Sequence, residues 1–221
     1  MSAGRSVVVV GVQYVTGFQV MTQLVTDGQC RWVVGVVGTE SPIKYCESAF
    51  VGKPNVKLYK GCATDRASLV EVCAKLHSDE IVPDLVLMYG EGHWDTKSFE
   101  VVSEATMLDW FRGAVLGPLN TIATFYSGMA NLANPVIAFY SSGWEEQGSA
   151  GRASVSSARH ALLGLVRCAR EDFYHEKISV VAVRHRNRRT GGTFFEMDFP
   201  TFCKQLLALN KTHSGTSQVL G

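Results

Sequence analysis

Two groups of residues in this chain have the types and the spacing to bind an anionic ligand. The first is a pair of glycines, Gly11 and Gly17, in a turn that follows the valines at residues 7–10. In a strand–turn–helix unit, glycines end the strand, let the backbone approach a pyrophosphate, and let the helix pack close to the sheet. The sequence therefore indicates a dinucleotide-binding type of βαβ unit at the start of the chain.

The second group is a basic cluster at residues 184–189, in which Arg184, Arg186 and Arg188 are the candidate anion ligands. It follows an apolar stretch at residues 178–183, so we expect it at the carboxyl end of a strand, the edge where such sheets bind ligands. Guanidinium groups there could hold a phosphate, an acidic partner or RNA. A solvated loop is the simpler interpretation. We do not expect nucleic-acid binding, because no aromatic residues for base stacking alternate with the arginines.

The glycine turn departs from a phosphate-binding pattern at its centre. Tyr14 or Val15 stands where a glycine would approach the phosphate, and a β-branched residue disfavours positive φ and places a Cβ in the phosphate's space. We interpret the turn as built for the fold, with its ligand-facing glycine missing. Glu40, just past the second predicted strand, stands where an acid would hold a ribose diol, although a solvated loop carboxylate is the alternative.

Strand-like and helix-like segments alternate along the chain. Strands are predicted at residues 7–10, 31–37, 56–59, 85–88, 136–140 and 178–183, and helices from 17 onward, near 41–42, at 66–77, at 103–133 with a kink at Pro118, at 153–173 and beyond 200. This alternation predicts a three-layer α/β/α sandwich with a doubly wound parallel sheet. We expect one domain over residues 1–221, with a divergent C-terminal segment at 184–221 whose final strand is shortened or absent.

Composition excludes several classes of protein. The 21 basic and 20 acidic residues nearly cancel, so no global field points to nucleic acid or a membrane. The six cysteines show no CxxC pair and no histidine at metal-ligand spacing, so we expect reduced core thiols and no metal. No apolar run approaches the roughly 18 residues of a membrane span, and no signal or transit peptide is evident. We expect a cytoplasmic protein.

Five sequence pieces then carry a family resemblance. VIAFYSSGWEEQGSAGR begins at residue 136, ALLGLVR covers 161–167 and ISVVAV covers 178–183, while KGCATDRASL covers 60–69 and VLGPLN covers 115–120. In this order they resemble the short-chain dehydrogenase/reductase family over residues 7–183. The resemblance implies a Rossmann-like NAD(P)-binding fold.

The same resemblance implies a catalytic serine, tyrosine and lysine, and only one of them survives. The serine position is Ser142, the tyrosine position is Val155 and the lysine position is Arg159. Val155 cannot transfer a proton. Arg159 keeps a positive charge but replaces a compact ammonium with a wide planar fork, so the implied contact with the nicotinamide ribose is in question.

The cofactor positions implied by the resemblance have changed as well. The middle glycine of the turn is Val15, and the aspartate that would meet the adenine falls at Ala63, with Asp65 nearby. Gly90 lies in the segment Tyr-Gly-Glu-Gly that replaces the signature after the fourth strand. We therefore expect NAD(P) binding to be weakened or lost.

The leading hypothesis is a catalytically degenerate short-chain dehydrogenase-like protein that acts as a binding or assembly subunit. By resemblance, it would form a homodimer or a heteromer through the helices at 103–133 and 153–173. Two alternatives stay open. One is an NAD(P)-dependent oxidoreductase of a small carbonyl or alcohol substrate, with Ser142 and a non-standard proton donor such as Tyr140, Tyr89 or His160; the other is a nucleotide sensor with the 184–189 loop on the phosphate.

Overall fold

The computed structural model describes residues 4–38, 40–90, 101–141, 150–185, 198–210 and 213–220. Its strands are β1 (Ser6–Val10), β2 (Trp32–Val37), β3 (Val56–Lys60), β4 (Leu85–Met88), β5 (Val136–Tyr140), β6 (Ser179–His185) and β7 (Ser217–Leu220). They form one sheet of seven parallel strands in the order β3-β2-β1-β4-β5-β6-β7. The strand order reverses direction between β1 and β4, as the predicted doubly wound sheet requires.

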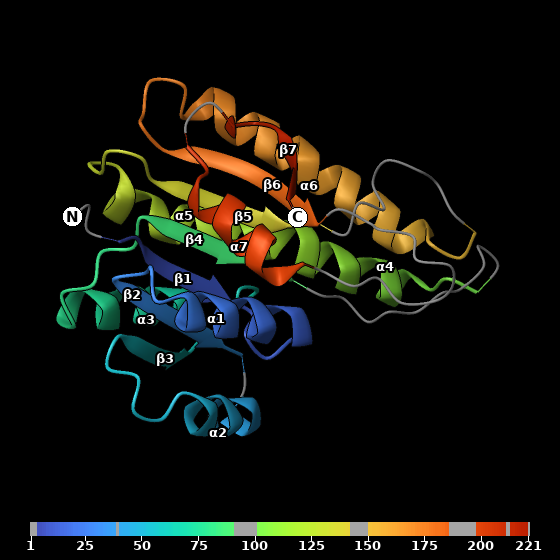
Figure 1. Ribbon diagram of the computed structural model, residues 1–221. Helices are drawn as coiled ribbons and strands as arrows, with labels where there is room; N and C mark the ends of the chain where they lie inside the picture. Colours follow the sequence, from blue (N-terminus) through green and yellow to red (C-terminus); the bar gives the residue numbers. More distant parts are fainter. Residues whose placement is uncertain are drawn as a thin grey trace.

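Helices cover both faces of this sheet (Figure 1). They are α1 (Val15–Asp27), α2 (Glu40–Ala49), α3 (Arg66–Ser78), α4 (Glu104–Phe111), a π-helical turn η1 (Arg112–Leu116), α5 (Gly117–Met129), α6 (Ala153–Asp172) and α7 (Phe199–Leu207). The predicted three-layer sandwich is confirmed. No described helix is long and apolar enough to cross a membrane.

The all-valine strand β1 sits in the middle of the sheet and is buried on both faces. Side chains alternate between the faces of a strand, so Val7 and Val9 pack in one apolar cluster with α1, α2 and α7. Val8 and Val10 pack in the other cluster, with α3, α5 and α6. A continuous β-branched run satisfies both faces at once, which is why this strand shows no polar alternation.

The C-terminal segment departs from the prediction. The alternative of a missing final strand is wrong, because the short strand β7 (Ser217–Leu220) pairs in parallel with β6, with Gln218 opposite Val183. The turn before β7 is fastened to β6, where the backbone N–H of Val180 donates to Ser214 Oγ and that of Gly215 donates to the Val180 carbonyl. An edge strand is paired on one side only, so it needs no long apolar run, and this explains why the sequence did not indicate it.

The helix predicted at 103–133 is interrupted immediately before Pro118. In η1 the backbone N–H of Gly117 donates to the carbonyl of Arg112, one residue farther than in an α-helix. Pro118 supplies no N–H, so it forms part of the first turn of α5 without losing a bond. Because a π-helical turn contains one residue more than an α-helical bond would enclose, it changes which way the residues from Arg112 onward face, compared with a regular α-helix.

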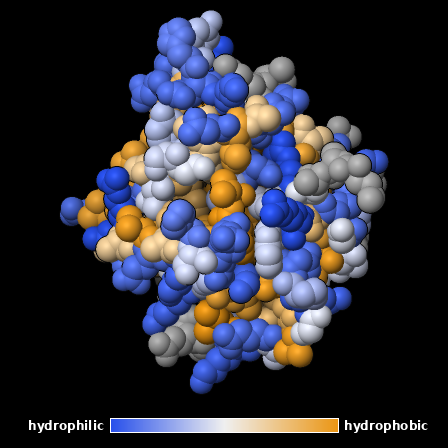
Figure 2. Space-filling model, turned by 90° about the vertical axis from the view of Figure 1, so that its left-hand side faces the viewer, coloured by the Kyte–Doolittle hydropathy of each residue, from blue (hydrophilic) through white to orange (hydrophobic). Residues whose placement is uncertain are grey.

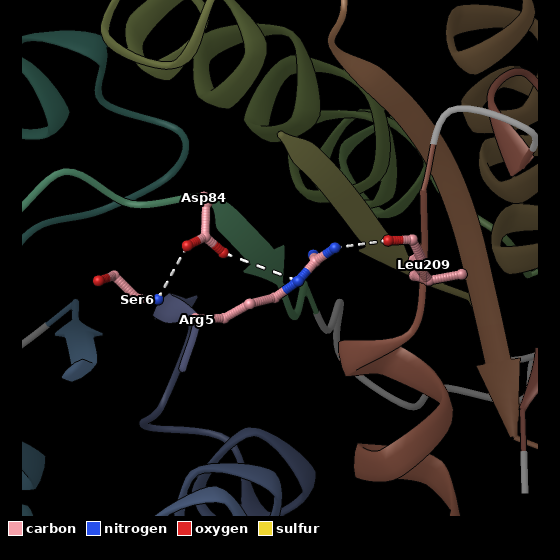
Figure 3. A network of polar contacts seen from close by, with 4 residues as sticks. All are labelled: Arg5, Ser6, Asp84 and Leu209. Carbon is pink, nitrogen blue, oxygen red and sulfur yellow. Dashed lines mark hydrogen bonds and ion pairs between the residues drawn. The ribbon is translucent and has the colours of Figure 1, made fainter. Parts of the chain in front are cut away.

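A polar network ties the start of β1 and the segment that follows α7 to the start of β4 (Figure 3). Asp84 accepts a hydrogen bond from the backbone N–H of Ser6 at 3.1 Å, and its other carboxylate oxygen lies 3.8 Å from Arg5 Nε. Arg5 Nη2 in turn donates to the carbonyl of Leu209 at 2.6 Å. The network lies at the amino-terminal edge of the sheet, so it is part of the scaffold and is far from the opposite edge.

Candidate functional site

The turn between β1 and α1 requires both of its glycines for the fold itself. Gly11 has φ +96°, and a Cβ built on it would lie 2.0 Å from the carbonyl oxygen of Tyr89. A Cβ on Gly17 would lie 2.4 Å from the carbonyl oxygen of Gly11. Any larger residue would collide with backbone at both positions. These glycines are therefore needed with or without a ligand, as the sequence interpretation held.

The centre of the same turn carries side chains where a phosphate-binding turn would be bare. Helix α1 begins at Val15, two residues earlier than predicted, and Val15 is 72% exposed. Tyr14 is the N-cap residue, but its side chain makes no capping bond, and its ring lies 6.2 Å from the ring of Tyr89. The outer side of this helix end is thus formed by an apolar β-branched residue.

A cavity of about 490 Å³ lies at the carboxyl ends of β1, β3 and β4. Its walls are mainly backbone and small or apolar side chains, and polar groups of Gln13, Thr64, Asp109 and Arg112 contribute to its lining. Gln13 Oε1 also accepts a hydrogen bond from the backbone N–H of Gly38 at 3.1 Å, which holds this side chain over the end of β2. This is the edge of a doubly wound sheet at which ligands bind.

The cavity brings together only part of the predicted cofactor set. Gly11, Tyr14 and Gly90 line it, whereas Val15 and Gly17 do not. Asp65 serves instead as the N-cap of α3, where its carboxylate accepts from the backbone N–H groups of residues 67 and 68. Glu40 is the first residue of α2, and its side chain lies outside the described part of the structure.

Two residues of the cavity were missed in the sequence. Asp109 comes from α4 and Arg112 from η1, and both side chains are exposed. Their only sequence signal is a three-residue spacing on a predicted helix, which places two side chains on one face but is common on any solvated helix. They reach the cavity because α4 and η1 lie beside the end of β4, where Gly90 and Gly113 allow a close approach. A Cβ built on Gly90 would lie 3.1 Å from the Gly113 carbonyl oxygen.

Arg159 is almost completely buried, with 3% of its surface exposed. Its guanidinium donates from Nη1 to the carbonyl of Tyr140 and from Nη2 to the carbonyl of Gly90, both at 2.9 Å. The side chain therefore links the ends of β5 and β4. One turn earlier on α6, Val155 is also buried and packs in a cluster with Trp110, Ala114 and Ala158.

A family model described as short chain dehydrogenase matches residues 5–191 of the chain. The chain belongs to this family. Among the curated proteins no significant match was found.

Many solved structures share the fold of this short-chain dehydrogenase family member. A short-chain dehydrogenase/reductase from Serratia marcescens is 16% identical, with a TM-score of 0.81, and the match covers 98% of this chain and 96% of that one. Serine dehydrogenase from Escherichia coli is 13% identical with a TM-score of 0.82, and the match covers 97% of both chains. At 12% identity, the NADPH-bound structure of a Pseudomonas aeruginosa short chain oxidoreductase, described as containing an atypical catalytic center, has a TM-score of 0.83. That match covers 97% of this chain and 94% of the other.

The alternative proton donors of this family member lie in different surroundings. The rings of Tyr89 and Tyr140 are 4.4 Å apart and both residues are buried in the apolar cluster beneath α1 and α7. His160 is exposed on α6, and its Nδ1 lies 2.9 Å from the carbonyl oxygen of Ser156. None of the cavity-lining residues comes from β5 or α6, and His160 and Tyr140 are not among them. Tyr89 is the one candidate donor that also lines the cavity.

Three predicted site residues, Ser142, Arg186 and Arg188, lie outside the described residues. Arg184 is described and belongs to β6, because that strand continues to His185, two residues beyond its predicted end. Its backbone is in register with Val219 of β7, and its side chain is half-buried. Within the described ranges, no three His, Cys, Asp or Glu residues are grouped so that they could hold a metal ion.

A smaller cavity of about 210 Å³ lies at the opposite, amino-terminal edge of the sheet. It is bounded by the end of α3, the segment 80–83 and the second half of α5, and apolar residues such as Leu76, Val82 and Phe125 line it. Figure 2 views the molecule from this edge and shows hydrophobic residues gathered in the middle of the face.

Proposed function

We propose that this member of the short-chain dehydrogenase family does not catalyse hydride transfer and acts as a binding or assembly subunit. The observation that carries the proposal is the position of Arg159. Its guanidinium is buried and donates to the carbonyls of Tyr140 and Gly90, so both outer nitrogens of the fork are engaged with the backbone. A lysine at this position of the family lowers the pKa of the catalytic tyrosine and binds the nicotinamide ribose. Arg159 is engaged in holding two strand ends together.

The tyrosine position supports the same proposal. Val155 has no titratable group and is packed against Trp110 and Ala114, so no space is left there for a phenol without rearrangement. Proton transfer to a substrate oxygen requires a donor within hydrogen-bond reach of it. Tyr140 does not line the cavity. Tyr89 does line it, but the residue is only 3% exposed and its ring packs against the ring of Tyr140.

An NAD(P) cofactor is what family membership supports, and the chain fits such a cofactor in part. Gly11 and Gly90 provide bare backbone at the cavity. Val15 supplies a side chain at the helix end where the pyrophosphate would approach, and Arg159 is committed to two carbonyls. The neighbour described as NADPH-bound and as containing an atypical catalytic center is consistent with cofactor binding in a chain whose catalytic residues are non-standard. We propose that binding of the complete dinucleotide is weakened.

For assembly, we propose the outer face of α4, η1 and α5, together with α6, as the contact surface of a homodimer or a heteromer. Leu108 is 51% exposed, Leu116 40% and Leu119 47%, one on each of the three consecutive helical segments. Moving large aliphatic side chains out of water is favourable, by roughly 25 cal/mol for each Å² of apolar surface that is buried. A contact between two such faces would cover them.

Steady-state assays test the proposal that the protein does not catalyse hydride transfer. The purified protein is incubated with NADH or NADPH and a panel of small carbonyl compounds, and with NAD⁺ or NADP⁺ and a panel of alcohols, while absorbance at the nicotinamide band is followed. An intact family member serves as the positive control. We expect no rate above that of the buffer. A rate that disappears in the Ser142→Ala variant would overturn the proposal in favour of the oxidoreductase alternative.

Native mass spectrometry tests the assembly surface. We expect a dimer, or a complex with a co-expressed relative, that dissociates when Leu116 and Leu119 are both replaced by glutamate. The matched control is Val70→Glu on α3, since Val70 is 53% exposed and lies on another helix. The proposed assembly surface would be contradicted if the unmodified chain stayed monomeric both alone and with a co-expressed relative. It would also be contradicted if the control Val70→Glu dissociated the complex as much as the double leucine variant.

A further inference from the structure

The small cavity at the amino-terminal edge of the sheet, between α3 and α5, has an apolar inner wall and an exposed rim. Leu76 and Phe125 line it and are each 2% exposed, so they form the inner wall. Val82 also lines it and is 52% exposed, so it belongs to the rim. The volume of about 210 Å³ is below the roughly 300–1,000 Å³ of sites for drug-sized ligands. The cavity therefore suits a molecule with one small ring or a short alkyl chain.

Two helices end beside this cavity. Helix α3 ends at Ser78 and helix α5 at Met129, and each lines the cavity with its last two turns. The carboxyl end of a helix carries the negative end of the helix macrodipole, which favours a cation nearby, most of all in a partly buried position. Lys75 in the last turn of α3 is exposed and does not line the cavity. Two helix dipoles thus make this apolar cavity favourable for a positive charge.

Glu80 adds a carboxylate at the rim of the cavity, from a backbone conformation that suits glycine. Glu80 is the acidic residue among those that line the cavity, and this lining contains no lysine or arginine. Its φ is +55°, and it is the one non-glycine residue with positive φ in the described part of the chain. Its N–H donates to the His77 carbonyl and that of Ile81 to the Leu76 carbonyl, a helix ending that usually has glycine at this position. Such strain is typical of functional positions.

We propose that this cavity binds a small amphipathic cation, an alkylammonium or arylalkylammonium ion. The apolar body of the ligand packs against Leu76 and Phe125, and its ammonium group lies at the rim beside the Glu80 carboxylate. The hydroxyl of Ser127, which is exposed on α5 and lines the cavity, can accept a further hydrogen bond from the ammonium group. The cavity lies at the edge opposite the family's cofactor site, so this binding does not depend on whether a dinucleotide binds or hydride transfer is lost.

Amide NMR titrations of the full chain test the charge and the place of the ligand. The probes are phenethylamine, which is an ammonium ion at neutral pH, 2-phenylethanol and phenylacetate, in the same low-salt buffer. We expect phenethylamine to bind with a Kd of about 1 mM or below and to shift signals of residues 76–83 and 124–128. The uncharged alcohol should bind about fivefold more weakly, and phenylacetate should bind more weakly still. Absence of phenethylamine binding, shifts confined to other residues, or equal affinity for the amine and the alcohol would overturn the inference.

A variant that fills the cavity tests its location while keeping the fold. Gly128 lines the cavity, and a Cβ built on it would meet no atom within 4 Å, so a larger side chain has room there. Leucine also favours a helix over glycine, so Gly128→Leu should be at least as stable as the unmodified chain. We expect it to abolish phenethylamine binding. The control Gly164→Leu, at an equally open position on α6 outside the cavity, should bind as the unmodified chain does. Undiminished binding to Gly128→Leu would overturn the location.

The role of the carboxylate is tested by Glu80→Gln, which removes the charge and keeps the length of the side chain. We expect the preference for phenethylamine over 2-phenylethanol to fall from about fivefold to about twofold, because the two helix dipoles remain. The control is Glu71→Gln, whose side chain is exposed on the same helix and does not line the cavity, and it should leave the preference unchanged. A preference that Glu80→Gln leaves at its original value would overturn the assignment of Glu80.

Discussion

The α-carbon of Gly17 lies so close to the carbonyl oxygen of Gly11 that a Cβ built on residue 17 would stand 2.4 Å from that oxygen. This contact fixes the start of α1 over the end of β1. The same Gly11 is pressed against the Tyr89 carbonyl, so the turn is also anchored to the chain that follows β4. The first turn of the fold is thus preserved by backbone contacts, and a phosphate is not needed to explain it.

Gly17→Ala should therefore lower the free energy of unfolding by about 1–3 kcal/mol, because backbone must move to admit the methyl group. The matched control is Gly164→Ala on α6, where a Cβ meets no atom within 4 Å. That change should raise the free energy of unfolding by up to about 1 kcal/mol, since alanine favours a helix over glycine. Urea denaturation of both variants measures the difference, and equal effects would contradict the contact.

Arg159→Met should lower the free energy of unfolding by about 2–4 kcal/mol, because the buried Tyr140 carbonyl and the partly buried Gly90 carbonyl lose their charge-assisted donors. The control on the same helix is Arg167→Met, whose side chain is exposed and should change stability by no more than about 0.5 kcal/mol. Chemical denaturation followed by circular dichroism provides both values. If the two methionine variants were equally stable, the bridge between the strand ends would contribute nothing.

Much of this architecture could be predicted from local sequence. The apolar runs that became β1, β2, β4 and β5 are buried on both faces, and such runs have few other stable locations. The change of the tyrosine position to Val155 could also be read directly, since a missing hydroxyl is a property of the residue itself. The family could be predicted because several sequence segments, each only weakly similar to the family, occur in the family's order along the chain.

The remaining features depend on contacts that no local pattern encodes. The two acceptors of Arg159 are backbone carbonyls 19 and 69 residues away, and any residue can supply a carbonyl. Arg112 reaches the cavity through a π-helical turn ahead of Pro118, which a helical periodicity does not reveal. The cysteines were predicted to be reduced core thiols. This is wrong for Cys168, which is exposed on α6, and Cys62 and Cys73 are only partly buried.

The exposed thiol gives a prediction of its own. All six cysteines are free, and burial raises the pKa of Cys30 and of Cys73 to about 11 and that of Cys203 to about 12. Since the thiolate is the nucleophile, Cys168 should be modified first by a maleimide or an aromatic disulfide at pH 8. Mass spectrometry of peptides after brief labelling identifies the site. Cys168→Ser should remove the fast phase, and its persistence would contradict the observed exposure.

The Asp84 carboxyl should make stability depend on pH in a defined direction. Burial raises its pKa, outweighing the Ser6 N–H and Arg5, which lower it. The folded state then binds a proton more readily than the unfolded state, so this group stabilises the fold most below its unfolded pKa and least above its folded pKa. The stability of the unmodified chain relative to Asp84→Asn should therefore increase as pH falls from 7 to 4.

A control carboxyl should show the opposite trend. The Tyr59 hydroxyl, and then Lys57, lower the pKa of Asp79. Its contribution is present above the unfolded pKa and is lost as pH falls through the folded pKa. The stability of the unmodified chain relative to Asp79→Asn should decrease over the same interval in urea titrations. Parallel trends for the two positions would show that burial does not dominate at Asp84.

Restoring the family's catalytic pair should not restore catalysis. In the double variant Val155→Tyr with Arg159→Lys, the phenol must enter a buried cluster that contains Trp110 and Ala114, and the shorter lysine cannot bridge the Tyr140 and Gly90 carbonyls as the fork does. We expect a loss of about 1–3 kcal/mol in unfolding free energy from the added volume alone, and no NADPH oxidation with the carbonyl panel.

The phenylalanine counterpart, Val155→Phe with Arg159→Lys, separates the effect of the phenolic hydroxyl from the effect of the added ring volume. It adds nearly the same volume at residue 155 without a proton donor, so both double variants should be destabilised alike and both should be inactive. NADPH oxidation by the tyrosine variant and not by the phenylalanine variant would show that a phenol at this position reaches both cofactor and substrate. That result would mean that the buried cluster around residue 155 admits a working phenol, and it would contradict the proposed loss of hydride transfer.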